Sequence, residues 1–95
     1  MNKTRLQAGD FLQIEFRKGE APQMRFFRPN LDGCLRADNE GDRTLLPRPS
    51  EGVSNTAHVA TILYAIAGVT GLRTSKLDRA EFNGGEIFKV EMLES

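Results

Sequence analysis

The stretch NTAHVATILYAIA, residues 55–67, decides the fold of this chain, because it contains no Asp, Glu, Lys or Arg. Its bulky apolar side chains recur at the spacing of one helix face, and they are Val59, Ile62, Leu63 and Ile66. A second stripe of smaller side chains recurs every four residues, at Ala57, Thr61 and Ala65. The pattern predicts a helix over about residues 55–67. We expect Ser54 or Asn55 to cap it and a glycine, Gly68 or Gly71, to end it.

Both stripes of this helix are apolar or uncharged, which has a consequence for packing. A helix that is apolar nearly all round is covered on more than one side. In a domain this small, the second cover is either the rest of the chain or another copy. Three arrangements are possible. The small stripe faces the sheet and the bulky stripe faces a partner, or the bulky stripe faces the sheet and the small stripe faces a partner. In the third arrangement, both stripes are buried within one chain.

The first half of the chain alternates in the way that is typical of half-buried strands. Residues 11–17 place Leu12, Ile14 and Phe16 on one face. Residues 18–22 form a loop that contains glycine and proline, and residues 23–28 place Met24 and Phe26 on one face of a second strand. The two strands predict a hairpin. Its expected register pairs Phe16 with Met24, Ile14 with Phe26 and Glu15 with Arg25.

The remaining segments complete a sheet. Residues 34–37 and 44–46 are short strand candidates, and residues 47–53 form a proline-containing link. Residues 87–93 alternate as a strand. Residues 74–82 fit either a short helix or a strand, and the Asn-Gly pair at 83–84 favours a strand that turns into the last one.

The predicted fold class is α+β: an antiparallel β-meander packed by one apolar helix and completed by a C-terminal strand or hairpin. Residues 1–95 form a single domain, with a β-rich half at 1–46, a loop at 47–53, the helix at about 55–67 and the final strand or hairpin at 72–93. The expected core consists of Leu12, Ile14, Phe16, Met24, Phe26, Leu35, Leu45, Val59, Ile62, Leu63, Ile66, Phe88, Val90 and Met92.

The charge balance argues against some functions. Lys and Arg together number 13, as do Asp and Glu, so the formal net charge is zero. A dedicated nucleic-acid-binding protein usually has a basic excess. Neutrality also leaves little repulsion between copies of the chain, which favours self-association.

Cysteine use and hydropathy indicate the compartment. Cys34 is the single cysteine, and small secreted domains usually need disulfides. The polar N-terminus predicts no secretory leader. The longest apolar run, residues 59–69, is shorter than the roughly 20 residues that cross a bilayer. We therefore expect a small, soluble, cytoplasmic protein that is not embedded in a membrane.

No residue set typical of catalysis or metal binding stands out. Cys34 and His58 are each the only residue of their type, and nothing in the sequence brings them together. One His and one Cys do not make a zinc site. The acidic residues within 38–42 lack the spacing of a calcium loop, and residues 68–72 lack the motif of a phosphate-binding loop. The sequence therefore predicts no metal and no cofactor, and it favours a non-enzymatic protein over an enzyme.

Two surfaces are candidates for binding. Aromatic and basic side chains interleave on the outward face of the first hairpin and the following strand, at Phe11, Arg17, Arg25, Phe27 and Arg36. Such a set is suited to a protein contact, or to stacking and neutralising single-stranded nucleic acid. A pocket between helix and sheet, lined by His58 and Tyr64, would instead suit a small molecule. The leading hypothesis is a non-enzymatic interaction module that binds another macromolecule and forms a homodimer, with nucleic-acid binding and small-molecule binding as alternatives.

Overall fold

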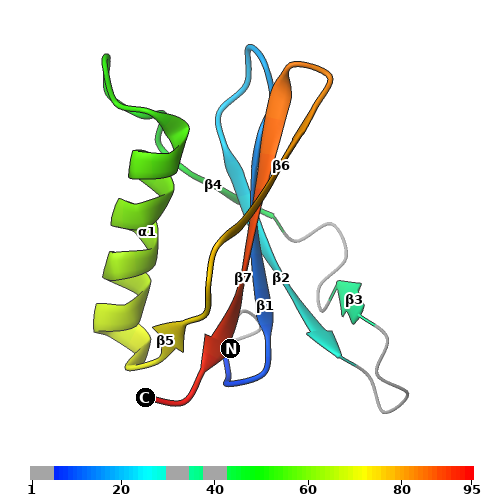
Figure 1. Cartoon of the computed structure of the whole chain (residues 1–95), viewed down its shortest axis with the longest axis vertical. Coiled ribbons are helices and arrows are strands. Elements are labelled where there is room, and N and C mark those ends of the chain that lie inside the picture. The colour runs from blue at the N-terminus through cyan, green and yellow to red at the C-terminus, as the bar shows by residue number, and fades with distance from the viewer. Residues whose placement is uncertain (1–5, 30–34, 38–42) are drawn as a thin grey trace.

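The computed structural model describes residues 6–29, 35–37 and 43–95. A single layer of antiparallel strands lies against one helix, α1 (Asn55–Thr70), as Figure 1 shows. The strands are β1 (Phe11–Phe16), β2 (Gln23–Pro29), β3 (Leu35–Ala37), β4 (Thr44–Leu45), β5 (Arg73–Thr74), β6 (Asp78–Phe82) and β7 (Gly85–Leu93). The arrangement confirms the predicted α+β class.

The sheet is centred on the first and last of these strands. Its order is β3-β2-β1-β7-β5, so β1 pairs with β2 on one side and with β7 on the other. The outer edge of β2 pairs with β4 near one end and with β3 near the other. The outer edge of β7 pairs in the same way with β6 and β5. The turns of the two long hairpins, β1–β2 and β6–β7, therefore lie at the same end of the sheet, where α1 also begins (Figure 1).

The register of the first hairpin differs from the prediction by two residues. Ile14 pairs with Met24 rather than with Phe26, and Glu15 lies opposite Gln23 rather than Arg25. The turn decides this, because the Glu20 backbone N–H donates to the Arg17 carbonyl and Gly19 holds a φ of 78° between them. A positive φ is accessible to glycine at little cost, so the turn centres on it. A shift of two keeps every side chain on its predicted face.

The C-terminal hairpin resolves the ambiguity over residues 74–82 in favour of a strand. Phe82 pairs with Gly85, which leaves a two-residue turn made of Asn83 and Gly84. Their φ values of 40° and 80° are both positive. A turn with two positive φ values matches the twist of the flanking strands and favours Asn-Gly.

The core lies between α1 and the facing side of the sheet. Its buried side chains are Leu12, Ile14, Phe16, Phe26, Val59, Leu63, Phe88, Val90 and Met92, all of them predicted. Met24, Ile62 and Ile66 pack against this cluster and are partly buried. Leu45 was predicted as core and is 69% exposed, because β4 is a two-residue strand at the edge of the sheet. The side chain of Leu35 lies outside the described residues.

The ends of α1 match the predicted caps, and its length exceeds the prediction by three residues. The Ser54 hydroxyl accepts a hydrogen bond from the Ala57 backbone N–H at 3.1 Å. Gly71, with a φ of 77°, ends the helix, and its N–H donates to the Ala67 carbonyl. Gly68 is not the stop and lies within the last turns of α1. Glycine is tolerated there at a modest energetic cost.

One carboxylate lies inside this otherwise apolar structure. Asp10 is 2% exposed and precedes β1. Its two oxygens accept hydrogen bonds from Nε and Nη2 of Arg28 at 2.9 and 3.0 Å. Oδ2 also accepts the Gln7 backbone N–H at 2.9 Å. The carboxylate thereby fastens the segment before β1 to the far end of β2.

Candidate functional site

The side of α1 that faces away from the sheet is exposed along its whole length. Five residues define this outer face of α1: Ala57, Ala60, Thr61, Tyr64 and Gly68, all of them exposed. Tyr64, at its centre, is 84% exposed. The structure selects one of the arrangements that the sequence left open. The bulky stripe of α1 packs against the sheet, and the stripe of small side chains faces solvent. Burial of both faces within the described part of one chain does not occur.

The composition of this face is unusual for a surface helix. The helix carries no acidic residue in its first turn and no basic residue in its last, and its sequence has no charged side chain between them. Surface helices normally place charged or polar side chains opposite the core. Val69, at the end of the same helix, is 87% exposed. The solvent side of α1 thus resembles an uncovered contact surface.

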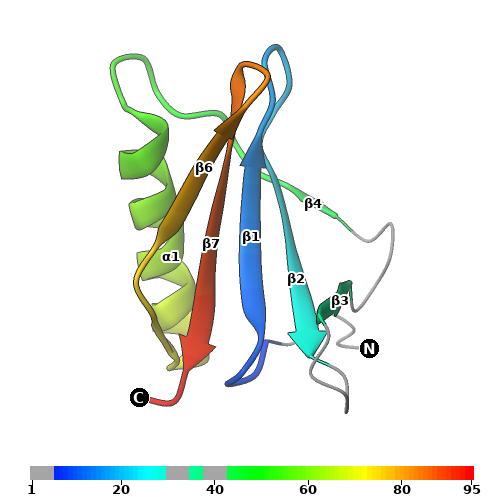
Figure 2. The ribbon, with the colours of Figure 1, turned by 45° about the vertical axis from the view of Figure 1, so that its right-hand side comes forward.

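The face of the sheet opposite α1 carries the predicted aromatic and basic side chains. Phe11 and Phe27 are direct partners across β1 and β2 and share this face. The Arg25 guanidinium lies 4.9 Å from the centroid of the Phe27 ring, and the Lys89 ammonium lies 5.3 Å from that of Phe11. In Figure 2 this face is turned towards the viewer, and α1 lies behind β6 and β7. The structure therefore brings Phe11, Arg25 and Phe27 together.

Lys89 belongs to this cluster, although the hairpin alone did not indicate it. It pairs with Gln13 of β1, which places it beside the aromatic pair. The alternation of β7 contains the signal, because Phe88 and Val90 point to the core and the residue between them points away. What the sequence did not supply was the pairing of β7 with β1.

The other two residues of the predicted hairpin surface are placed differently. Arg17 follows the end of β1, and its Nε donates to Glu15 at 2.6 Å. This hydrogen bond and the charge of Glu15 raise the pKa of Arg17. Arg36 pairs through its backbone with Arg28, and Ala37 holds the position opposite Phe27. The side chain of Arg36 lies outside the described residues.

His58 and Tyr64 do not come together. The His58 ring lies edge-on to Phe16 at a centroid distance of 6.4 Å, and its Nε2 is 2.8 Å from the Pro47 carbonyl oxygen. Tyr64 points to solvent on the outer face of α1. His58 thus joins the loop before the helix to the edge of the core.

A charged network ties the start of α1 to the C-terminal hairpin. Nδ2 of Asn55 donates to Oε1 of Glu86 at 2.8 Å, and Nε of Arg79 donates to Oε2 at 2.7 Å. Arg79 also contacts Glu81 through Nη2. The hydrogen bond from Asn55, followed by that from Arg79 and its charge, lowers the pKa of Glu86 below its ordinary value of 4.5.

Replacement of Asn55 by alanine is expected to raise the pKa of Glu86 towards 4.5, because the ionised carboxylate loses the hydrogen bond that contributes most to lowering its pKa. A carboxylate with a lowered pKa stabilises the fold above its unfolded pKa, and this contribution is lost as the pH falls through the folded value. An NMR titration of the Glu86 carboxyl measures the shift. Thr56→Ala, at the exposed neighbouring position, serves as the control. An unchanged pKa in Asn55→Ala would show that the amide does not hold this carboxylate.

Few other groups in the described residues are suited to catalysis or metal binding. No three His, Cys, Asp or Glu side chains within residues 6–29, 35–37 and 43–95 are placed to hold a metal ion. In the same residues, no helix is long and apolar enough to cross a membrane. Cys34 lies outside the described residues, so its distance from His58 stays open.

Comparison with known proteins supplies no relative from which a function can be transferred. The two surfaces described above, on α1 and on the sheet, are therefore interpreted from their own chemistry. The chain matches no family model, no curated protein and no solved structure.

Proposed function

We propose that this protein is a small, non-enzymatic interaction module that pairs with a second copy of itself through the outer face of α1. The observation that carries the proposal is the exposed, uncharged surface of that helix, with Tyr64 at its centre. Apolar helix faces are normally buried, and tyrosine is among the residues enriched at the centres of protein interfaces. The bulky stripe already fills the core, so the face left over is the one offered to a partner.

The spacing of the outer face suits a symmetric helix pair. Ala57, Thr61, Tyr64 and Gly68 are separated by four, three and four residues, the spacing of a seam between two packed helices. In an antiparallel pair around a two-fold axis, Ala57 lies opposite the partner's Gly68. Thr61 then lies opposite the partner's Tyr64. Small residues at both ends allow the helices to approach closely, while the two tyrosines fill the middle.

The size of the surface sets the expected strength. A helix of 16 residues is about 24 Å long. One helix face alone covers less than the roughly 800 Å² per partner of a standard interface. We therefore expect a reversible dimer with a dissociation constant in the micromolar range.

Sedimentation equilibrium across micromolar to millimolar concentrations tests the proposal. The unchanged protein is expected to pass from monomer to dimer. Tyr64→Glu is expected to remain monomeric, because two buried carboxylates would meet at the seam. Ala80→Glu, which adds the same charge at an exposed position of β6, is the matched control and is expected to dimerise normally.

A monomer at millimolar concentration would overturn the homodimer. Dimerisation that survives Tyr64→Glu but is lost in a variant of the open sheet face, such as Phe27→Ala, would move the interface to that face. The sheet face carries Glu15 and Glu91 beside Arg25 and Lys89, and this mixed charge favours a protein over a nucleic acid as its partner. Nucleic-acid binding there stays a prediction from the sequence.

A further inference from the structure

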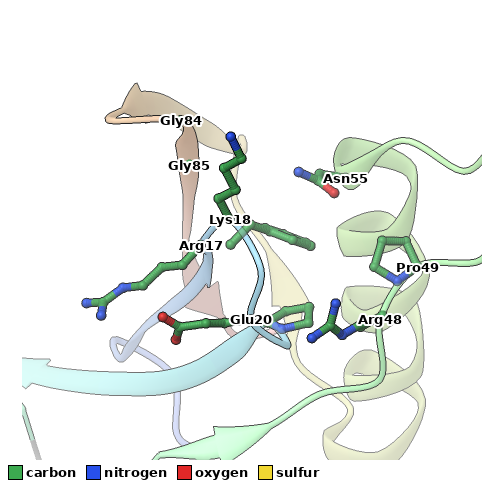
Figure 3. Close-up of a pocket in the computed structure, with 10 residues that line it drawn as sticks. Arg17, Lys18, Glu20, Arg48, Pro49, Asn55, Gly84 and Gly85 are labelled. Atoms are coloured by element: carbon green, nitrogen blue, oxygen red, sulfur yellow. The ribbon is translucent and has the colours of Figure 1, made fainter.

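A pocket opens at the end of the molecule where both hairpin turns meet the start of α1. Its volume is ≈ 310 Å³, within the range of small-molecule sites. Four separate segments of the chain contribute to it: the β1–β2 turn, residues 48–49, the first residue of α1 and the β6–β7 turn (Figure 3). None of the residues that define the outer face of α1 lines it. The pocket is therefore independent of the proposed dimer.

Two cations in this pocket lack a carboxylate partner. Within the described residues, neither the Lys18 ammonium nor the Arg48 guanidinium takes part in an ion pair. Arg48 donates one hydrogen bond, from Nη2 to the Gly19 carbonyl at 3.2 Å. A guanidinium has five N–H donors, so most of those on Arg48 are left for a ligand.

Two other charged residues, Arg17 and Glu20, also line the pocket. Arg17 is paired with Glu15, and Glu20 adds to the negative charge that Arg17 experiences. Figure 3 shows Arg17 and Glu20 pointing to the same side, away from Arg48 and Pro49. Lys18 and Arg48 outnumber the Glu20 carboxylate, which leaves the pocket with one net positive charge.

The start of α1 forms another part of the wall. Asn55 is the first residue of the helix and lines the pocket. A helix N-terminus carries a partial positive charge, and the Glu86 carboxylate bonded to Asn55 offsets it here. The Asn55 amide is fixed by its hydrogen bond to Glu86, which holds the helix end against the hairpin turn.

The wall between the cations is apolar. Phe16 and Pro22 are buried at its base, and Pro49 borders it. Inorganic phosphate alone would leave this wall and much of the volume unfilled. An anion that carries a flat organic body uses both parts, because apolar walls with a few convergent polar groups are typical of ligand sites.

We propose that this pocket binds a small organic phosphate, with the phosphate group on Arg48, the flexible Lys18 side chain turned in from the direction that Figure 3 shows, and the organic body against Phe16 and Pro49. Charge-assisted hydrogen bonds from Arg and Lys to phosphate are the strong contacts in such a site. The site is a binding site, and no reaction is assigned to it.

The test uses adenosine monophosphate as the probe, with adenosine and inorganic phosphate as separate arms. Two-dimensional NMR of the full chain follows the backbone amides of Lys18, Asn55, Gly84 and Gly85 during each titration. Adenosine monophosphate is expected to shift these amide resonances in a saturable way. Adenosine and inorganic phosphate are each expected to bind at least about tenfold more weakly.

Variants connect the binding to the two cations. Arg48→Gln and Lys18→Gln are each expected to weaken binding about tenfold, because each removes one charged contact to the phosphate. Lys76→Gln removes an exposed cation outside the pocket and is expected to leave the affinity unchanged. The amide spectrum of each variant without ligand confirms that it is folded.

Several results would overturn the proposal. Equal binding of adenosine and adenosine monophosphate would show that the phosphate is not recognised. Equal binding of inorganic phosphate and adenosine monophosphate would show that the apolar wall takes no part. Absence of shifts at millimolar probe, or the same loss of affinity in Lys76→Gln as in Arg48→Gln, would remove the site itself.

Discussion

Replacement of Gly85 by alanine is expected to destabilise the fold by about 3 kcal/mol. Gly85 begins β7, and a Cβ atom built on it would lie 2.3 Å from the backbone carbonyl oxygen of Phe16. The obstacle is main chain at the end of β1, so no side-chain rotation relieves the clash. The start of β7 would have to move away from β1 and weaken the pairing of Phe16 with Glu86. Denaturant unfolding followed by circular dichroism measures the loss.

Gly84→Ala is the matched control for this prediction. Gly84 has a φ of 80°, and a Cβ atom there would meet nothing within 4 Å. Its replacement costs only the strain of a left-handed alanine, about 1 kcal/mol. If Gly85→Ala destabilises the protein no more than Gly84→Ala, the close approach of the two strands is not what requires glycine.

Replacement of Asp10 by alanine is expected to cost about 2–3 kcal/mol. The change removes the carboxylate that accepts hydrogen bonds from the Arg28 guanidinium and the Gln7 backbone N–H. Breaking a fully buried ion pair costs more than this. The Arg28 side chain is 36% exposed, so water replaces part of the lost interaction. Urea unfolding at neutral pH measures the difference in the free energy of unfolding.

Two further variants separate charge from shape in this pair. Asp10→Asn keeps the side-chain volume and one acceptor oxygen. Its free energy of unfolding is expected to lie between those of the wild type and Asp10→Ala. Glu15→Ala breaks the ion pair with Arg17, whose side chain is 48% exposed, and is expected to cost less than about 1 kcal/mol. Equal losses in Asp10→Ala and Glu15→Ala would contradict the anchoring role of Asp10.

Alternation along the chain was sufficient to predict β1, β2 and β7 and the side chains that they turn to the core. It did not fix the register, because Ile14 opposite Met24 and Ile14 opposite Phe26 give the same two faces. Only the conformation of Gly19 at the turn distinguishes them. The error at Leu45 has a similar origin: an apolar residue in a two-residue edge strand has little sheet around it to pack against.

The binding surfaces were predicted to different extents. The alternation of two neighbouring strands predicted that Phe11 and Phe27 share a face, but the predicted register did not make them direct partners. The exposure of Tyr64 depended on which stripe of α1 faces the sheet, a choice that the sequence left open. The pocket beside Lys18 and Arg48 was not predicted, since its walls come from four segments that only the folded chain brings together.

The pairing of β1 with β7 also determines how the protein is made. Phe11 in the first strand lies opposite Glu91 in the last strand of the sheet, so the central ladder closes only after β7 has been synthesised. Contacts between residues so distant in sequence slow folding, because the intervening chain must be ordered before they form. Until β7 is in place, the apolar face of the first hairpin lacks the side chains of Phe88, Val90 and Met92 that complete the core.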